Sequence, residues 1–231
     1  DMMKNEPVLS FGDPNTLSTN ASRSEYAALS GFVRANFDYD QRYILELNAR
    51  YDGSSRFSPG IRFGFFPSAA FAWRINREKW MRKVKWIDNL KLRASYGRLG
   101  NDNVSNSYAY ADRMSSTAYY SFGGTMVNGI AYSMFADPYT TWEKVDQTNV
   151  GLDFDFLNQF SLSVDLFGKK VSDMLCALKP LPSLGTLQNG AALNVGSMLN
   201  RGFEVSLAWR KTFGRVWVGI GGNIGYVHNT V

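Results

Sequence analysis

A strict two-residue alternation of apolar and polar side chains constrains the fold of this chain more than any other feature. Between residues 43 and 52 the odd positions are tyrosine, leucine, leucine, alanine and tyrosine, whereas every even position except Ile44 is polar or charged. Successive side chains of a β-strand point to opposite faces of a sheet. The segment therefore predicts a strand with one apolar face and one polar face.

The same period recurs through most of the chain and predicts about eight strands. The expected strands cover residues 29–39, 43–52, 65–75, 90–96, 149–156, 160–169, 202–210 and 216–226. Short connections at 38–42, 77–88, 157–159 and 211–215 alternate with long ones at 52–62, 97–141 and 172–200. Because every second connection is short, we expect an all-β, up-and-down antiparallel meander with its tight turns gathered at one end.

Composition excludes several classes of protein. Among the 231 residues no apolar run approaches the ~18 residues that a membrane helix needs. The net charge of +5 is densest at residues 77–85 and comes with no reader motif, so we expect no nucleic-acid partner. Cys176 and His228 are the single cysteine and histidine, so we expect no metal site, no cofactor and no catalytic triad, and hence no enzyme.

Charged side chains in the expected strands share the polar face, and the apolar face of these stretches carries none. The fourteen are Arg34, Asp38, Glu46, Arg50, Asp52, Arg74, Lys91, Arg93, Asp153, Asp155, Asp165, Lys169, Glu204 and Arg210. A soluble sheet with one solvated face has the same segregation. Aromatic residues at both ends of the apolar face favour a transmembrane β-barrel instead, because they form girdles around a lipid-facing band. They are Tyr39, Tyr43, Phe156 and Phe160 at the short turns, and Tyr51, Tyr96 and Phe203 toward the long loops.

Several longer segments resemble one family. YDGSSRF (residues 51–57), GFFPSAAFAWRI (64–75), LKLRASYGRLGN (90–101), the segment 142–175 and GSMLNRGFEVSLAWR (196–210) are similar, in this order, to the barrel of SusC-like TonB-dependent outer-membrane transporters of the Bacteroidota. The resemblance implies that residues 1–231 are a central piece of a plugged barrel of about 22 strands. The signal peptide, the TonB box, the plug and the remaining strands would then lie outside this sequence.

The resemblance also implies a function and partners. We expect import of an oligosaccharide or a peptide across the outer membrane, with a SusD-like surface lipoprotein as a lid and with energy from TonB-ExbB-ExbD. The fourteen charges would face the lumen. The inward glycines Gly97, Gly151, Gly202, Gly219, Gly221 and Gly225 would leave space for the plug.

Tyrosines in the long segment 97–141 are the candidate contacts to ligand or lid, because aromatic rings stack on sugars and pack against partner proteins. They are Tyr108, Tyr110, Tyr119, Tyr120, Tyr132 and Tyr139. The competing interpretation is that these rings only pack the loop on itself. The competing function is a self-contained eight-stranded outer-membrane barrel with a structural or adhesive role. A soluble β-protein remains a further alternative.

Overall fold

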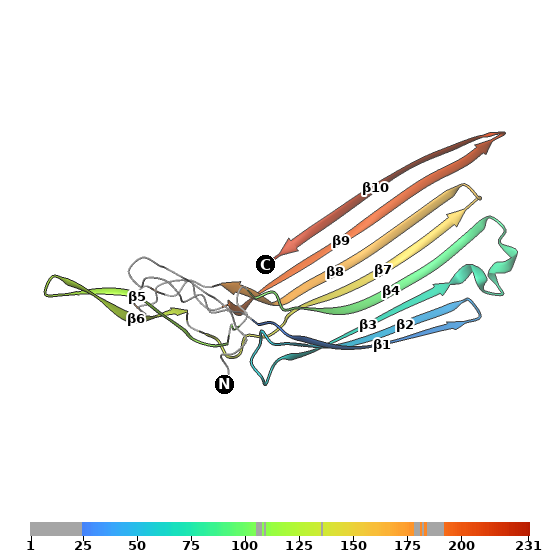
Figure 1. Cartoon of the computed structure of the whole chain (residues 1–231). Helices are drawn as coiled ribbons and strands as arrows, with labels where there is room; N and C mark the ends of the chain where they lie inside the picture. The colour runs from blue at the N-terminus through green and yellow to red at the C-terminus, as the bar shows by residue number, and fades with distance from the viewer. Residues whose placement is uncertain are drawn as a thin grey trace.

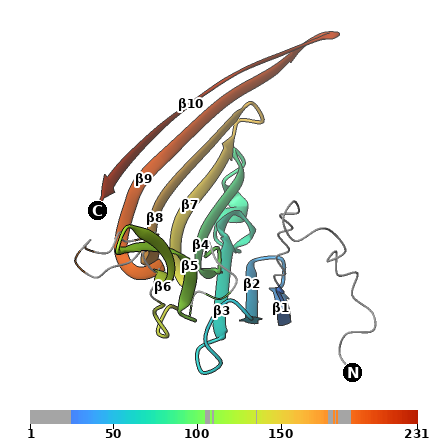
Figure 2. The same cartoon turned by 60° about the vertical axis from the view of Figure 1, so that its left-hand side comes forward.

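One antiparallel sheet dominates the computed structural model, which describes residues 25–104, 108, 110–134, 136–177, 181, 183 and 192–231. Its strands are β1 (Ala28–Tyr39), β2 (Tyr43–Ser54), β3 (Phe63–Arg74), β4 (Ile87–Asn101), β7 (Glu143–Phe156), β8 (Phe160–Ala177), β9 (Ala192–Phe213) and β10 (Val216–Thr230). They are hydrogen-bonded in the order β1-β2-β3-β4-β7-β8-β9-β10, and Figures 1 and 2 show that the sheet curves. The predicted all-β antiparallel meander is thus confirmed.

Tight turns join the strands at one end of the sheet. The backbone is left-handed at Asp40 and Gln41 and again at Leu157 and Asn158, as the twist of tight hairpins favours. The β3–β4 connection is longer and contains two short 3-10 helices, η1 (Ile75–Arg77) and η2 (Met81–Lys83). In the described part of the chain, no helix is long and apolar enough to span a bilayer.

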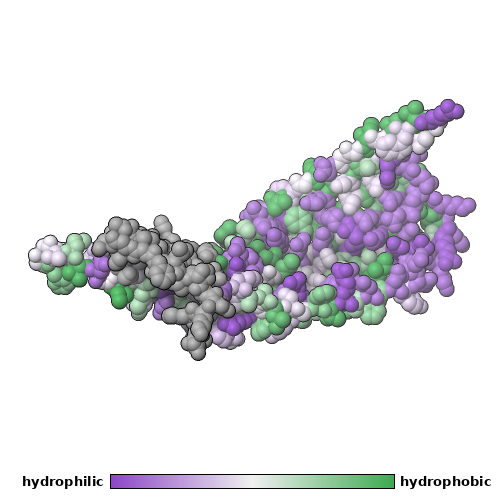
Figure 3. All heavy atoms as spheres, in the orientation of Figure 1, coloured by the Kyte–Doolittle hydropathy of each residue, from purple (hydrophilic) through white to green (hydrophobic). Residues whose placement is uncertain are grey.

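The register of the ladders shows that the two faces run across β3, β4, β7, β8 and β9. One row of directly paired residues contains Ala72, Arg93, Gly151, Asp165 and Glu204, and the neighbouring row on the opposite face contains Trp73, Leu92, Leu152, Val164 and Val205. Figure 3 looks onto the hydrophilic side of the sheet, where polar residues predominate over β4, β7 and β8.

On the apolar face, large side chains are exposed rather than enclosed. Leu47 is 41% exposed and Leu207 is 50% exposed, and Leu162 pairs directly with Leu207. A soluble sheet would bury such a face under a second layer. The aromatic rings at the short-turn end contact one another, with centroids 6.4 Å apart for Tyr39 and Tyr43 and 5.0 Å apart for Phe156 and Phe160. This exposed face with its aromatic end is the expected surface of a membrane barrel.

Pro67 marks the place where one ladder stops. β3 pairs with β2 over its full central length, but its pairing with β4 begins at Ser68, the residue directly after the proline. Proline has no backbone N–H to donate to a ladder. Beyond this point Phe66 is buried, and its ring occupies the space beside Gly64 and Gly100.

The connection after β2, one of the long connections expected from the sequence, is closed by a small core. Phe57 is fully buried and packs with Phe66, Val104 and Trp142. The Phe57 and Trp142 ring centroids are 5.2 Å apart, and the Trp142 indole N–H donates to the carbonyl of Arg62 at 3.0 Å. A single aromatic residue in a polar segment therefore anchors the loop against β3 and the start of β7.

The strands extend beyond the predicted bounds, and one hairpin was not predicted. Strand β8 continues to Ala177 and β9 begins at Ala192, inside the segment 172–200 that we expected to be a loop. The segment 97–141 contains a separate hairpin of β5 (Arg113–Phe122) and β6 (Thr125–Met134). In Figure 1 this hairpin projects beyond the long-loop end of the sheet.

Candidate functional site

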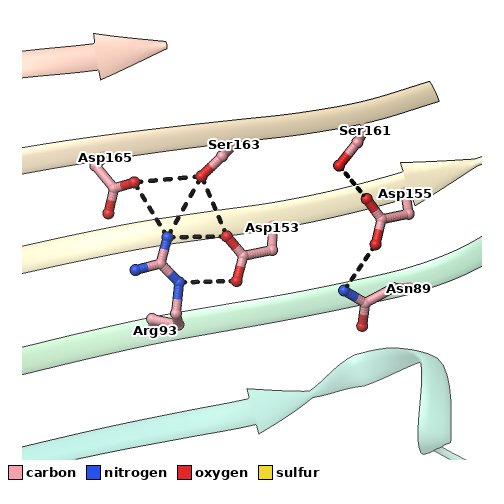
Figure 4. A network of polar contacts seen from close by, with 7 residues as sticks. All are labelled: Asn89, Arg93, Asp153, Asp155, Ser161, Ser163 and Asp165. Atoms are coloured by element: carbon pink, nitrogen blue, oxygen red, sulfur yellow. Dashed lines mark hydrogen bonds and ion pairs between the residues drawn. The ribbon is translucent and has the colours of Figure 1, made fainter. Parts of the chain in front are cut away.

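An ion-pair network on the polar face joins three strands (Figure 4). Arg93 on β4 donates from Nε and Nη2 to the two carboxylate oxygens of Asp153 on β7, both at 2.9 Å. Its Nη2 also lies 3.1 Å from Asp165 on β8. The Ser163 hydroxyl, which has a single proton to donate, lies 3.2 Å from Asp153 and 3.3 Å from Asp165. One arginine thus binds two carboxylates that repel each other.

Gly151 makes this network feasible. It is paired with Arg93 on one side and with Asp165 on the other. A Cβ atom at this glycine would lie 2.7 Å from Nη2 of Arg93 and clash with the Asp165 carboxylate. The missing side chain therefore gives room to the guanidinium of Arg93.

Other inward glycines are also covered by neighbouring side chains. A Cβ at Gly202 would lie 2.6 Å from the ring of Phe167, and one at Gly219 would lie 2.7 Å from the indole of Trp217. At Gly97 the nearest atom is the Cβ of Ser68, at 3.3 Å. Only ordinary contacts surround Gly221 and Gly225, with nearest atoms at 3.5 Å. Among these inward glycines, Gly221 and Gly225 are thus the ones with no close side-chain neighbour.

The remaining candidate charges lie on the same face but not in one cluster. Glu46 forms an ion pair with Arg34 at 3.1 Å, and Arg50 forms one with Asp52 at 2.6 Å. Asp155 accepts hydrogen bonds from the Asn89 amide at 3.1 Å and from the Ser161 hydroxyl at 2.5 Å.

Two polar hollows on this face lie beside the network. Arg74 lines one of about 490 Å³ near the short turns, and Lys169 and Glu204 line another of about 570 Å³ on β8 and β9. Arg210 lies near the β9–β10 turn, and its backbone N–H donates to the carbonyl of Gln159 at 2.7 Å. In the described strands, the polar face therefore carries both ion-paired and single charges, spread along its length.

A third hollow of about 630 Å³ opens at the long-loop end, and sequence reasoning missed it. Its wall combines the rings of Tyr26, Phe66 and Trp142 with Arg50 and Asp102. Asp102 accepts hydrogen bonds from the hydroxyls of Ser54 at 2.8 Å and Tyr26 at 3.0 Å.

The Asp102 contacts join two distant sequence segments. The guanidinium of Arg56, in YDGSSRF, donates from Nη1 to the Asp102 carbonyl at 2.9 Å and lies 4.7 Å from the ring centroid of Tyr26. Asp102 directly follows LKLRASYGRLGN. The sequence did carry a signal for this contact, because YDGSSRF and LKLRASYGRLGN both resemble segments of the same family.

The loop tyrosines fall into two groups. Tyr108 and Tyr110 contact each other, with ring centroids 6.5 Å apart. Tyr119, Tyr120 and Tyr139 are 62%, 65% and 81% exposed, and Tyr132 is 38% exposed. Tyr119 and Tyr120 are adjacent on β5 and point to opposite faces of the hairpin. Tyr108 and Tyr110 thus pack on each other. Tyr119, Tyr120 and Tyr132 lie on the β5–β6 hairpin, where Tyr120 also packs on Phe122 with ring centroids 4.8 Å apart, and Tyr139 lies outside the hairpin.

At the short-turn end, a buried carboxylate organises the β3–β4 connection. Glu78 accepts hydrogen bonds from the Tyr43 hydroxyl at 2.7 Å and the Trp73 indole at 3.1 Å, and it forms an ion pair with Arg42 at 3.3 Å. These contacts, of which the Tyr43 hydrogen bond contributes most, lower the pKa of Glu78 below its usual value. In the part of the chain that the structure describes, no group of three His, Cys, Asp or Glu side chains is arranged to hold a metal ion.

Comparison with known proteins identifies relatives in sequence and in fold. TonB-dependent receptor SusC of Bacteroides thetaiotaomicron is 36% identical over 184 residues, which cover 78% of this chain and 18% of that protein. TonB-dependent receptor P3 of Formosa agariphila is 35% identical over 197 residues, covering 85% of this chain and 19% of that protein. The chain thus spans about a fifth of the length of these curated relatives.

Solved structures share the arrangement of strands. The RagAB peptide transporter superposes with a TM-score of 0.77 at 29% identity, covering 94% of this chain and 24% of that one. The siderophore receptor PirA of Pseudomonas aeruginosa has a TM-score of 0.57 at 13% identity, over 89% of this chain and 32% of that one, which shows a shared fold alone.

The family assignment rests on nearly the whole chain. The family model described as "TonB dependent receptor-like, beta-barrel" matches residues 4–231. Its members are transporters and receptors of the outer membrane, not enzymes. The resemblance inferred from the sequence is thereby confirmed. This chain belongs to the TonB-dependent receptor-like β-barrel family, and its sheet is part of an outer-membrane barrel wall.

Proposed function

We propose that this chain forms part of the wall of a TonB-dependent transporter that imports a bulky nutrient, an oligosaccharide or a peptide, through the outer membrane. The observation that carries the proposal is an open sheet with an exposed apolar face and a face of paired charges. Strands β1 and β10 form the edges of this sheet and do not pair with each other. A closed eight-stranded barrel requires that pairing, so its absence from the described ladders disfavours the structural or adhesive alternative.

The long, unprotected edges support a larger barrel. The unpaired edge of strand β10 is fifteen residues long, and two of its apolar side chains, Ile220 and Ile224, are 67% and 66% exposed. Proteins avoid leaving such an edge unpaired because it templates aggregation. Residues 1–231 would therefore be a partial barrel domain, with the plug, the TonB box, the signal peptide and further strands supplied by sequence outside this stretch.

The face with the Arg93 network would line the lumen. A wide lumen is hydrated and holds a polar plug, so the charges on β4, β7 and β8 remain solvated or paired. Movement of the plug, driven by TonB-ExbB-ExbD, would then open a polar path along this wall. No bond in the cargo changes, which agrees with the scattered arrangement of the carboxylates.

The hairpin β5–β6 would contribute to capture of the cargo or to contact with a SusD-like surface lipoprotein. Its tyrosines are exposed, and aromatic rings bind both sugar faces and protein surfaces. The similarity to the RagAB peptide transporter supports peptide as a cargo class, and oligosaccharide is the class that the sequence resemblance to SusC-like transporters implies.

Uptake by the native host tests the proposal. Cells that express the protein from its whole reading frame would receive fluorescent oligosaccharide and peptide libraries, with strains lacking the gene or lacking TonB as comparisons. Loss of accumulation of one library in both strains is the expected result. Equal uptake in all three strains would contradict the proposed transport.

A second experiment addresses the hairpin. Replacing residues 113–134 by a short glycine-serine linker should lower uptake and co-purification of the surface lipoprotein while leaving the barrel folded. The matched control is substitution of Tyr108 and Tyr110, which contact each other. Undiminished uptake without the hairpin would assign the capture role elsewhere.

A further inference from the structure

The connection between β3 and β4, residues 75–86, exposes both cations and indole rings. Trp80 is 62% exposed and Trp86 is 52% exposed. Five exposed basic residues accompany them, namely Arg77, Lys79, Arg82, Lys83 and Lys85. Arg77 lines the polar hollow near the short turns with Asp88 and Asp155, which leaves the other four outside it. We call residues 75–86 the basic turn. Tryptophan with lysine or arginine is the composition that proteins use at the boundary between lipid and water.

Contacts fix the basic turn to the apolar face of the sheet. Tyr43 and Trp73, which donate hydrogen bonds to Glu78 of the turn, lie opposite each other on that face. The indole of Trp86 meets the ring of Phe154 edge to face, with centroids 6.0 Å apart. Phe154 pairs with Leu162 on the apolar face. The basic turn is therefore continuous with the lipid-facing aromatic end of the sheet.

The charges of the basic turn are unbalanced. Among the described residues, Lys79, Arg82, Lys83 and Lys85 have no ion-pair partner, and Glu78 is engaged by Arg42. The β9–β10 turn, at the same end of the sheet, also places a cation beside an aromatic ring, since the Lys211 ammonium lies 5.3 Å from the ring centroid of Phe213. Toward the long loops, by comparison, cations such as Arg98 and Lys144 form ion pairs, with Asp146 at 2.8 Å and with Asp173 at 2.9 Å.

We propose that the basic turn is a binding site for anionic phospholipid headgroups in the periplasmic leaflet of the outer membrane. Short turns of bacterial outer-membrane barrels lie on the periplasmic side. A phosphate diester there would meet Lys79, Arg82, Lys83 and Lys85, while Trp80 and Trp86 sit at headgroup level. This inference depends on the membrane location of the sheet and not on the proposed import.

Lipid fits this surface better than a periplasmic protein does. A protein partner would approach from the aqueous end, whereas Tyr43, Trp73 and Phe154 tie the basic turn to the side that faces hydrocarbon. Negatively charged headgroups also supply the charge that the turn lacks, and the attraction amounts to a severalfold gain in affinity for each basic residue near the surface.

Native mass spectrometry of the detergent-purified protein, expressed from its whole reading frame, tests the proposal. The probes are phosphatidylglycerol and phosphatidylcholine with identical acyl chains. The test variant combines Lys79→Gln, Arg82→Gln, Lys83→Gln and Lys85→Gln. The matched control removes four charges from the polar face, with Arg34→Gln, Lys91→Gln, Lys169→Gln and Arg210→Gln. Heat-modifiable migration in gels verifies that each variant is folded.

We expect the unmodified protein and the control to prefer phosphatidylglycerol, and the test variant to lose at least about tenfold in affinity for it. A further variant with Lys79→Arg, Lys83→Arg and Lys85→Arg keeps the charge and should keep the preference. Affinity of the test variant within about twofold of the unmodified protein would overturn the proposal. Site-specific crosslinking at Lys83 in cells that captures a protein, with lipid affinity unchanged by the substitutions, would assign the turn to that protein instead.

Discussion

The guanidinium of Arg93 crosses directly over Gly151 to reach Asp165 two strands away. The three residues form one row across β4, β7 and β8, and Nη2 of Arg93 lies 3.1 Å from the Asp165 carboxylate. A β-carbon on the central residue would lie 2.7 Å from Nη2. The ion-pair network therefore depends on a residue that contributes no side-chain atom to it.

Gly151→Ala should consequently destabilise the barrel by about 1–3 kcal/mol, because the guanidinium must leave the geometry that satisfies both carboxylates. Urea unfolding from lipid vesicles measures the change. The control is Gly221→Ala, where the new methyl group meets only ordinary contacts at 3.5 Å. If the two alanine variants unfold at the same urea concentration, the network does not require the glycine.

Stability at acidic pH should depend on Glu78. Its pKa in the folded protein lies below the ordinary value of 4.5, chiefly because the Tyr43 hydroxyl donates to the carboxylate. The unfolded chain then binds the proton more readily, so the stabilisation is present above about pH 4.5 and is lost as the pH falls through the folded pKa. Melting temperatures measured between pH 3 and 6 should fall less steeply for Glu78→Gln. Parallel curves for both proteins would contradict this role.

Phe57→Ala should open the loop after β2. The side chain is fully buried against Trp142, and truncation of a buried phenylalanine costs about 3–5 kcal/mol. Because β2 and β3 remain paired, the loss should appear as faster amide hydrogen exchange at residues 54–62 and not as unfolding of the sheet. Phe63→Ala, at a 47% exposed position, is the control and should leave this exchange slow. Unchanged exchange in Phe57→Ala would show that the small core does not hold the loop.

Alternation of side chains predicted the eight sheet strands because one face must meet hydrocarbon. The predicted strands were too short beyond the band of side chains that meets hydrocarbon. Toward the long loops, β8 and β9 carry polar side chains on both faces, as at Lys169 and Lys170, so the period no longer marks the strand. Backbone pairing continues there regardless of what the side chains meet.

The β5–β6 hairpin was missed for a related reason. Its strands carry tyrosine and methionine at irregular spacing, and no large apolar face is repeated. A signal was present in Gly123 and Gly124, which both adopt positive φ between two strand-like segments. Contacts between distant segments, such as Arg56 with Asp102 or Arg93 with Asp165, depend on register and were beyond the reach of the period alone.

Arginine substitutions at two adjacent residues of β9 test most directly whether the apolar face meets lipid. Leu207 lies on that face, 50% exposed and paired with Leu162, and Ser206 lies on the polar face, paired with Ser163. Unfolding from lipid vesicles should show a loss of about 2–4 kcal/mol for Leu207→Arg and little change for Ser206→Arg. Equal tolerance of both substitutions, or a larger loss at Ser206, would contradict the assignment of the two faces.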